Sequence, residues 1–212
     1  MRTSTAVRLA IVAACVAVAI VLAHEVHEGE PIAADRAIMV AVHHAANPAL
    51  DGLMRALTFI GNPVPMTVIT LCAAGVLAAL GRRGEALALV LGVAAASLLD
   101  TGLKELFERV RPQLWPRPPV AGDSFPSGHA LTSTVAFGAM AAFAGRAFPR
   151  YAPAFAAAAA VLVAGIAFSR VYLGVHWPTD VVAGMAIGYV VLVVLLRATP
   201  HARTRATGPA TD

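Results

Sequence analysis

The sequence predicts an all-α, polytopic membrane protein with six transmembrane helices and short interfacial helices in its first outer loop. Of its 212 residues, 58% are hydrophobic and 13% are charged, whereas soluble domains are about 25% charged. The mean hydropathy is +0.74. The sequence also contains six apolar runs that can cross the roughly 30 Å hydrocarbon layer of a bilayer. These three observations point to lipid as the main solvent of the chain.

The first run could instead be the apolar core of a signal peptide, because Arg2 and Arg8 precede it. It ends at Leu22-Ala23-His24 without a small-residue cleavage site, so an uncleaved first helix is favoured. The fifth run is the shortest and is expected to recruit flanking residues. In chain order, the six runs are Val7–Ala23, Pro63–Leu80, Ala86–Leu103, Ala130–Phe148, Pro153–Phe168 and Thr179–Leu196.

The stretch from Pro31 to Asn62 is too polar to span a membrane. Its apolar spacing, seen for example at Ile38 and Val42, suits one or two short helices lying along the outer surface. A structural cover is the favoured role, and a lip through which lipid enters is the alternative. Residues 1–207 are predicted to form a single domain, and residues 208–212 a frayed tail.

The positions of the basic residues predict the orientation. With the N-terminus inside, nine of the sixteen Lys and Arg residues fall on inner connections and seven on outer ones. Three of the outer seven belong to the polar clusters described below, which leaves nine inside against four outside. The positive-inside rule therefore predicts cytoplasmic termini in a bacterial cytoplasmic membrane. The inner nine are Arg2, Arg8, Arg82, Arg83, Arg146, Arg150, Arg197, Arg203 and Arg205.

Composition argues against two other classes of protein. The net charge is +4, but the basic residues are scattered between apolar runs and aromatic residues make up only 6% of the chain, so a nucleic-acid partner is not expected. Cys15 and Cys72 both lie inside apolar runs and are interpreted as small buried hydrophobic residues. Their positions predict neither a disulfide framework nor a metal site.

Three polar clusters fall at the same predicted surface. The third run ends at Lys104, which Arg111-Pro112 follow, and the fourth begins at Ser127-Gly128-His129. The fifth ends at Ser169-Arg170, and a short loop carrying His176 leads to Asp180 in the sixth. Segments that are distant in the sequence are therefore expected to meet at one membrane boundary.

The first two clusters suit a phosphoryl group. Lys104 and Arg111 could be ordinary anchors at a helix end, but Arg111 precedes a proline, where a helix should stop, and its guanidinium fork matches phosphate oxygens. Ser127 could simply cap a helix. The unpaired N–H groups of that helix start also favour an anion, and Gly128 allows it to approach the backbone. With Arg170, these residues would form a phosphoryl cradle.

The third cluster contains a candidate nucleophile. Pro178 favours the first position of the sixth helix, so Asp180 lies near the helix N-terminus, where a carboxylate is stabilising without any catalytic role. Asp180 could also fix the tautomer of His176 and leave the other ring nitrogen free to attack. Two histidines and an aspartate could bind a metal, but the surrounding cations would repel one. The sequence therefore predicts no metal and no cofactor.

These residues resemble a known signature. Lys104-x6-Arg111-Pro112, Pro126-Ser127-Gly128-His129 and Ser169-Arg170-x5-His176-x3-Asp180 resemble the three-part signature of the type 2 phosphatidic acid phosphatase family. The resemblance covers about Asp51 to Leu196. The family includes lipid phosphate phosphatases and bacterial undecaprenyl pyrophosphate phosphatases, and vanadium haloperoxidases share its site. The resemblance implies a metal-independent membrane phosphatase that acts on lipid in the bilayer.

The resemblance also implies a role for each site residue. His176 attacks phosphorus and forms a phosphohistidine, and Asp180 orients it. His129 protonates the leaving oxygen and then activates water. The phosphoryl oxygens are held by Lys104, Arg111, Ser127, Gly128 and Arg170.

The substrate is less defined than the chemistry. Undecaprenyl pyrophosphate is favoured because the site faces outward in a small bacterial-looking protein, and phosphatidylglycerol phosphate, phosphatidic acid and lipid A phosphate stay open. A haloperoxidase is disfavoured because six spans bring lipid to the site. A transporter would place ionisable residues near the bilayer midplane. Asp100 is the only candidate for such a position, and the charges of the clusters instead gather at one membrane boundary.

Overall fold

The computed structural model describes residues 5–29, 32–116 and 119–199. The predicted tail at 208–212 and the basic residues Arg2, Arg203 and Arg205 lie outside these ranges. Within them the chain is helical and contains no strand. The helices are α1 (Thr5–His27), α2 (Ala33–His44), α3 (Pro48–Ile60), α4 (Pro63–Ala79), α5 (Arg83–Phe107), α6 (Gly128–Ala147), the 3-10 helix η1 (Pro149–Tyr151), α7 (Ala152–Tyr172) and α8 (Pro178–Ala198).

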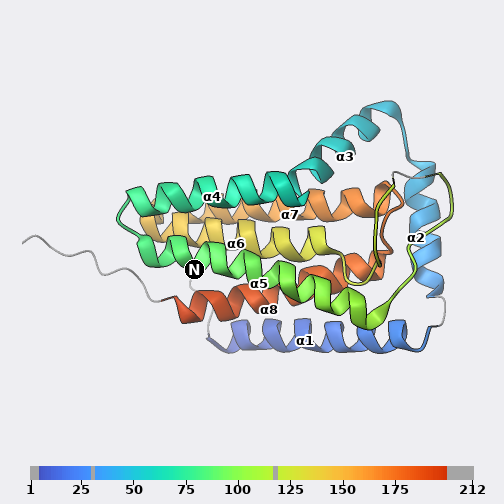
Figure 1. Cartoon of the computed structure of the whole chain (residues 1–212), viewed down its shortest axis with the longest axis horizontal. Coiled ribbons are helices and arrows are strands. Elements are labelled where there is room, and N and C mark those ends of the chain that lie inside the picture. The colour runs from blue at the N-terminus through green and yellow to red at the C-terminus, as the bar shows by residue number, and fades with distance from the viewer. Residues whose placement is uncertain (1–4, 30–31, 117–118, 200–212) are drawn as a thin grey trace, which may run out of the picture.

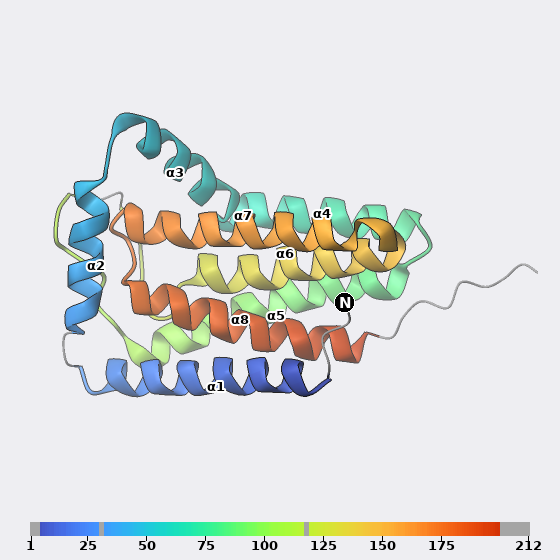
Figure 2. The same cartoon turned by 180° about the vertical axis from the view of Figure 1, so that it is seen from behind.

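The long helices form a bundle around α6. Helix α6 packs against α4, α5, α7 and α8, and it lies between them in Figures 1 and 2. Helix α1 runs along the outside of the bundle and packs mainly on α8. Because its neighbours shield α6, its surface does not need to be as apolar as that of a lipid-facing helix.

Each predicted apolar run forms a helix, but not every one of these helices meets the length and composition of a membrane span. By length and composition, four helices could cross a membrane, namely α1, α5, α7 together with η1, and α8. The pair α3 and α4, bent by 58° at its break, would make a fifth. Helix α6 is not in this set, and it carries hydroxyl residues such as Thr132 and Thr134 that bond to its own carbonyls. The six-span layout stays a prediction.

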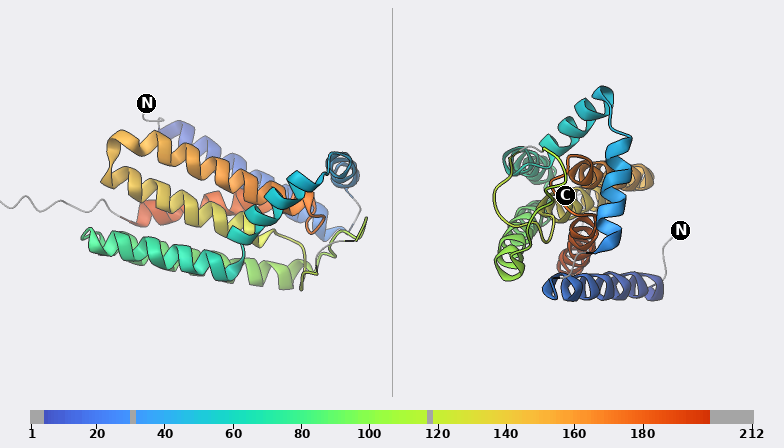
Figure 3. Two further views of the ribbon diagram at one scale, coloured as in Figure 1. Left: turned by 90° about the horizontal axis from the view of Figure 1, so that it is seen from above. Right: turned by 90° about the vertical axis from the view of Figure 1, so that its right-hand side faces the viewer.

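The polar stretch before α4 forms two short helices, as its periodicity predicts. Asn47 caps α3, because its Oδ1 accepts the N–H of Leu50 at 3.1 Å, and Pro48 occupies the first turn. The hydroxyl of Tyr172 in α7 donates to Asp51 at 2.7 Å and so fastens α3 to the bundle. Figure 3 shows α2 crossing one end of the bundle, with α3 slanting above it.

Glycine allows α6 and α8 to lie unusually close together. A Cβ atom on Gly184 would lie 2.6 Å from the carbonyl oxygen of Ser127, and one on Gly188 would lie 2.7 Å from that of Leu131. Small residues permit such close packing between membrane helices. The N–H of Ser127 also donates to the carbonyl of Asp180 at 3.0 Å. The starts of α6 and α8 are therefore held as one unit.

A buried ion-pair network holds the opposite end of the bundle. Glu85, only 2% exposed, accepts from Arg82 at 2.5 Å and from Arg146 at 3.2 Å. Arg146 also donates to the carbonyls of Leu196 and Thr199 at the end of α8, which satisfies acceptors that a helix terminus leaves open. The start of α1 and the end of α8 lie at this end (Figure 1).

Candidate active site

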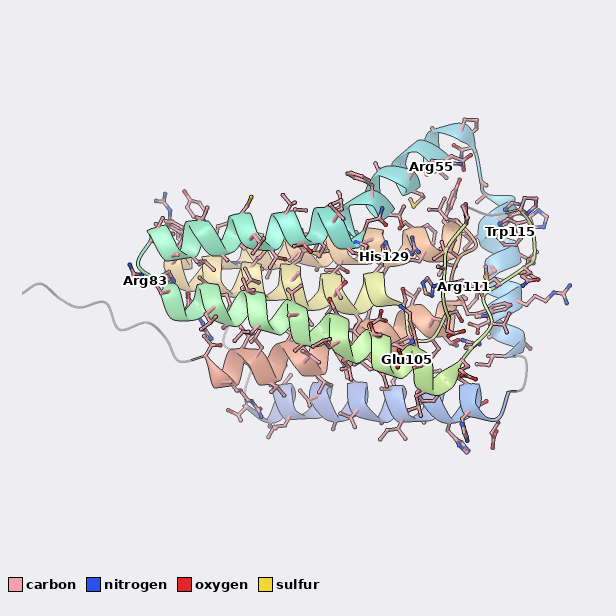
Figure 4. The ribbon with its side chains drawn as sticks, in the orientation of Figure 1. Arg55, Arg83, Glu105, Arg111, Trp115 and His129 are labelled. Atoms are coloured by element: carbon pink, nitrogen blue, oxygen red, sulfur yellow. The ribbon has the colours of Figure 1, made fainter. Side chains whose placement is uncertain are left out.

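The three polar clusters meet at the end of the bundle that α2 and α3 cover. They surround a cavity of about 630 Å³, within the size range of ligand sites. Ser127 and Asp180 do not line it and are fully buried, and Asp180 contacts His176. The predicted site residues that line the cavity are Lys104, Arg111, Gly128, His129, Arg170 and His176. Figure 4 shows Arg111 and His129 at this end of the bundle.

His176 lies in the tight loop between α7 and α8 and is 2% exposed. Its Nδ1 is 2.8 Å from the carbonyl oxygen of Ser124. Because a carbonyl can only accept, this contact places the ring proton on Nδ1. Nε2 therefore carries the lone pair, and it lies 3.0 Å from Nη1 of Arg111. This is the tautomer that an attacking imidazole requires.

Asp180 supports this ring less directly than the sequence predicts. Its Oδ2 is 3.4 Å from Nδ1 of His176, beyond the usual range of a hydrogen bond. The same oxygen accepts the N–H of Trp177 at 2.8 Å, and Oδ1 accepts from Arg109 at 2.5 Å. The acceptor that fixes the tautomer is thus the Ser124 carbonyl, and Asp180 acts as a neighbouring negative charge. A backbone acceptor leaves no side-chain signal in the sequence.

Arg111 is held in place before any substrate binds. Its Nη1 donates to the carbonyl of Val175 at 2.8 Å, its Nε to that of Gly122 at 2.8 Å, and its Nη2 to that of Asp123 at 2.9 Å. The side chain is only 7% exposed. A preorganised donor stabilises developing charge without paying for its own reorientation. The guanidinium is therefore fixed beside Nε2 of His176, the nitrogen predicted to attack.

Two buried donors near the cavity have no partner among the described residues, Oγ of Ser127 and Nε of Arg170. Ser127 holds the N-cap position of α6, as predicted, but its side chain makes no capping bond. Arg170 donates from Nη1 to the hydroxyl of Thr58, which leaves Nε unpaired. Unsatisfied buried donors are rare and call for an explanation. Here a bound anion would satisfy them.

Lys104 and Gly128 meet at a carboxylate that the sequence did not assign to the site. Nζ of Lys104 is 2.5 Å from Oδ2 of Asp100, one turn earlier in α5. This carboxylate packs on Gly128, where a Cβ atom would lie 2.4 Å from Oδ2. The glycine is therefore required for the close packing of this carboxylate, and its role in anion approach stays a prediction. Asp100 lies at the site end of α5 and lines the cavity.

His129 is oriented by the bend between α3 and α4. Its Nε2 is 2.9 Å from Oδ1 of Asn62. A Cβ atom on Gly61 would lie 2.7 Å from Cδ2 of the ring. From its sequence, this stretch is interpreted as a surface cover, or else a lip for lipid entry, and neither residue is singled out. Their contact with a histidine of the α6 start is visible only in three dimensions.

The titration of His176 suits a nucleophile. Burial lowers its pKa to about 4, with Arg170 and Arg111 acting in the same direction and Asp180 acting against them. Protonation would block Nε2, so a pKa lowered to about 4 keeps this nitrogen unprotonated until the pH falls toward 4. We expect carbethoxylation of His176, followed by mass spectrometry of its peptide, to show an inflection near pH 4. An inflection near 6.5, the ordinary histidine value, would contradict this environment.

The described residues contain no group of three or more His, Cys, Asp or Glu side chains that could hold a metal ion. The charged groups that line the cavity are instead mainly cationic. Such a donor set suits an anion and disfavours a metal cation.

Comparison with known proteins yields consistent matches. A family model described as the PAP2 superfamily matches residues 85–203. Phosphatidylglycerophosphatase B of Bacillus subtilis (strain 168) is 31% identical over 173 residues, which cover 80% of this chain and 85% of that protein. Decaprenylphosphoryl-5-phosphoribose phosphatase of Mycobacterium tuberculosis is 34% identical over 161 residues, covering 72% and 83%.

A solved structure shares the fold. The crystal structure of the first transmembrane PAP2 type phosphatidylglycerolphosphate phosphatase, from Bacillus subtilis, superposes with a TM-score of 0.79 at 28% identity. The match covers 88% of this chain and 94% of that one. The bundle and its helix order are therefore those of a known membrane phosphatase.

Proposed function

The chain belongs to the PAP2 superfamily and is an integral membrane lipid phosphatase, and we propose that it removes a terminal phosphate through a phosphohistidine on His176. One observation carries this proposal. The lone pair on Nε2 of His176 lies beside Arg111, at a site whose buried donors on Ser127 and Arg170 have no partner among the described residues. A phosphoryl group placed there would meet a nucleophile and donors together.

In the first step, the lone pair of His176 Nε2 attacks phosphorus and the bond from phosphorus to the leaving oxygen breaks. His129 donates a proton to that oxygen. The ring of His176 becomes cationic, and its charge is stabilised by the carboxylate of Asp180. The phosphoryl oxygens are held by Lys104, Arg111, Arg170, Ser127 and the N–H groups at the start of α6, beginning with Gly128.

In the second step, His129 removes a proton from water and the resulting hydroxide attacks phosphorus. The bond from phosphorus to Nε2 breaks, its electron pair returns to His176, and inorganic phosphate leaves. The positive side chains supply the charge stabilisation that magnesium supplies in other phosphoryl transfer enzymes. We therefore propose that the reaction needs no metal, and we expect activity to persist in EDTA.

Arg55 of α3 suggests the class of substrate. It lines the cavity, is exposed, and has no partner among the residues that the structure describes. It lies on α3, away from Arg111 (Figure 4). From there it would pair with a second phosphate of the substrate. The names of both relatives describe such lipids, in which an inner phosphodiester precedes a terminal phosphate. We propose a headgroup of this kind. Undecaprenyl pyrophosphate, with two adjacent phosphates, is the second candidate, because Arg55 would serve it as well.

A substrate panel with Arg55→Gln tests the proposal. Phosphatidylglycerol phosphate, undecaprenyl pyrophosphate and phosphatidic acid would be assayed for phosphate release by purified protein in EDTA. We expect kcat/KM to fall roughly two- to fivefold for the two-phosphate lipids, the scale of an exposed ion pair, and to stay unchanged for phosphatidic acid. Arg36→Gln removes the same charge from α2, outside the cavity, and serves as the matched control.

The outcomes of this panel are separable. If the protein releases phosphate from none of the three lipids, the proposed function is wrong. Equal losses on all three lipids, or a similar effect of Arg36→Gln, would remove Arg55 from substrate recognition while leaving the phosphatase intact.

We propose that the site faces the periplasm or the exterior and that both termini are cytoplasmic. The distribution of basic residues supports this orientation. The start of α1 and the end of α8 also lie at the end of the bundle opposite the site. A cysteine at Ala46, in a background without Cys15 and Cys72, should react with an impermeant thiol reagent added to whole cells. Protection of that cysteine until the membrane is opened would reverse the assignment.

A further inference from the structure

Helix α2 carries a fully buried carboxylate that the proposed chemistry does not use. Asp35 is 1% exposed, although α2 crosses the end of the bundle as an apparent cover (Figure 3). Its Oδ2 is 2.9 Å from Nη2 of Arg109. Its Oδ1 accepts the N–H of Thr179 at 2.9 Å, and Oδ2 accepts the hydroxyl of the same residue at 2.6 Å. A cover alone does not need a buried charge, which is costly unless paired.

Arg109 connects this carboxylate to the nucleophile's partner. Its Nη1 is 2.5 Å from Oδ1 of Asp180 and also donates to the hydroxyl of Thr179 at 2.8 Å. The guanidinium is therefore shared between Asp35 on one side and Asp180 on the other. Asp180 in turn lies 3.4 Å from Nδ1 of His176. Three elements, α2, the loop after α5 and the start of α8, meet in this chain of contacts.

The charges along this chain alternate in sign. A positive His176 ring, as formed on phosphorylation, would be followed by a negative Asp180, a positive Arg109 and a negative Asp35. Asp180 alone with Arg109 would form a neutral pair with little charge left to stabilise the imidazolium. The second carboxylate offsets Arg109 and restores the negative charge beside His176.

We propose that Asp35 is a positioning residue for the reaction, which acts through Arg109 to keep Asp180 oriented and effectively negative toward His176. Helix α2 is then part of the catalytic apparatus and more than a cover. The inference rests on the proposed function, because it concerns the charge of the phosphohistidine step. It adds a residue outside the three signature clusters and assigns a role to the Arg109 side chain.

Asp35→Asn tests this inference, because it keeps the size of the side chain and removes only the charge. We expect kcat to fall roughly 10- to 100-fold, by analogy with the loss of an outer-shell partner of a metal-bound histidine, while KM stays within threefold. Asp35→Glu retains the charge and should recover at least a third of the wild-type kcat. Phosphohistidine trapped during turnover should fall with kcat in Asp35→Asn.

Asp51→Asn is the matched control. Asp51 also fastens an interfacial helix to the bundle, through the hydroxyl of Tyr172 at 2.7 Å, but its contact leads away from Asp180. A purely structural role for Asp35 predicts that both asparagine variants lose thermal stability and activity together. The inference predicts a selective loss of kcat in Asp35→Asn alone.

Three results would overturn the inference: a kcat within twofold of wild type in folded Asp35→Asn, a loss confined to KM, or an equal loss of kcat in Asp51→Asn. If Asp35→Asn does not fold, Asp35→Glu is the deciding variant. A kcat below a tenth of wild type in folded Asp35→Glu would contradict a role based on charge, because this variant keeps the carboxylate. Absence of any phosphohistidine in the wild-type protein would instead count against the proposed function.

Discussion

Replacing His176 by alanine should lower kcat for lipid phosphate hydrolysis by roughly 10⁴-fold or more, as expected when a covalent nucleophile is removed. The side chain is 2% exposed and its Nε2 is the only candidate attacking atom in the proposed chemistry. Neighbouring donors would still bind the phosphoryl group, so we expect substrate binding to survive. The measurement is phosphate release under substrate saturation, with thermal unfolding recorded alongside.

His44→Ala provides the control for this variant. His44 ends α2, is exposed and does not line the cavity, so its removal should leave kcat within twofold of wild type. Residual activity above a tenth of wild type in folded His176→Ala would mean that another group attacks phosphorus, or that water attacks directly.

Arg111→Lys should have the second-largest effect, a loss of roughly 10²- to 10³-fold in kcat/KM, although it preserves the positive charge. The guanidinium donates to four loop carbonyls while its Nη1 lies 3.0 Å from Nε2 of His176. An ammonium group cannot reproduce that planar set of donors, and loss of one preorganised donor at a developing charge costs on this scale. Some loss of thermal stability should accompany it.

Arg83→Lys is the matched substitution at the other end of the bundle (Figure 4). Arg83 is exposed and does not line the active-site cavity, so activity should be unchanged. If Arg111→Lys keeps kcat/KM within threefold of wild type, charge alone suffices and the fixed geometry around Arg111 has no catalytic value.

Much of the fold could be predicted from the sequence, because a long run of apolar residues is a strong indication of a long helix. The runs predicted as spans correspond to α1 and α4–α8, and α7 extends beyond the predicted Pro153–Phe168 to Tyr172. The exact ends of helices depend on local contacts that hydropathy does not record. The central position of α6 was also not predictable, because its hydroxyl residues reduce its apolar signal while its neighbours bury it.

The sequence predicted the parts of the site that are formed by side chains better than the parts that are formed by backbone groups. His176, His129 and Arg111 have side-chain chemistry that reveals them. The Ser124 carbonyl that fixes the His176 tautomer does not, because every residue has a carbonyl. Asp35 and Asn62 lie in the stretch interpreted as a surface cover or a lip for lipid entry. Their contacts with Arg109 and His129 were not predictable, because they join segments that are distant in the sequence.

Detection of the covalent intermediate tests the central claim most directly. Purified protein would be mixed with a lipid phosphate substrate in EDTA and quenched rapidly in alkali, which preserves phosphohistidine, and its peptides would be examined by mass spectrometry. We predict one phosphoryl group on Nε2 of His176, formed and lost at rates compatible with kcat, and absent from His176→Ala. Steady release of phosphate with no phosphorylated His176 at any quench time would contradict the proposed mechanism.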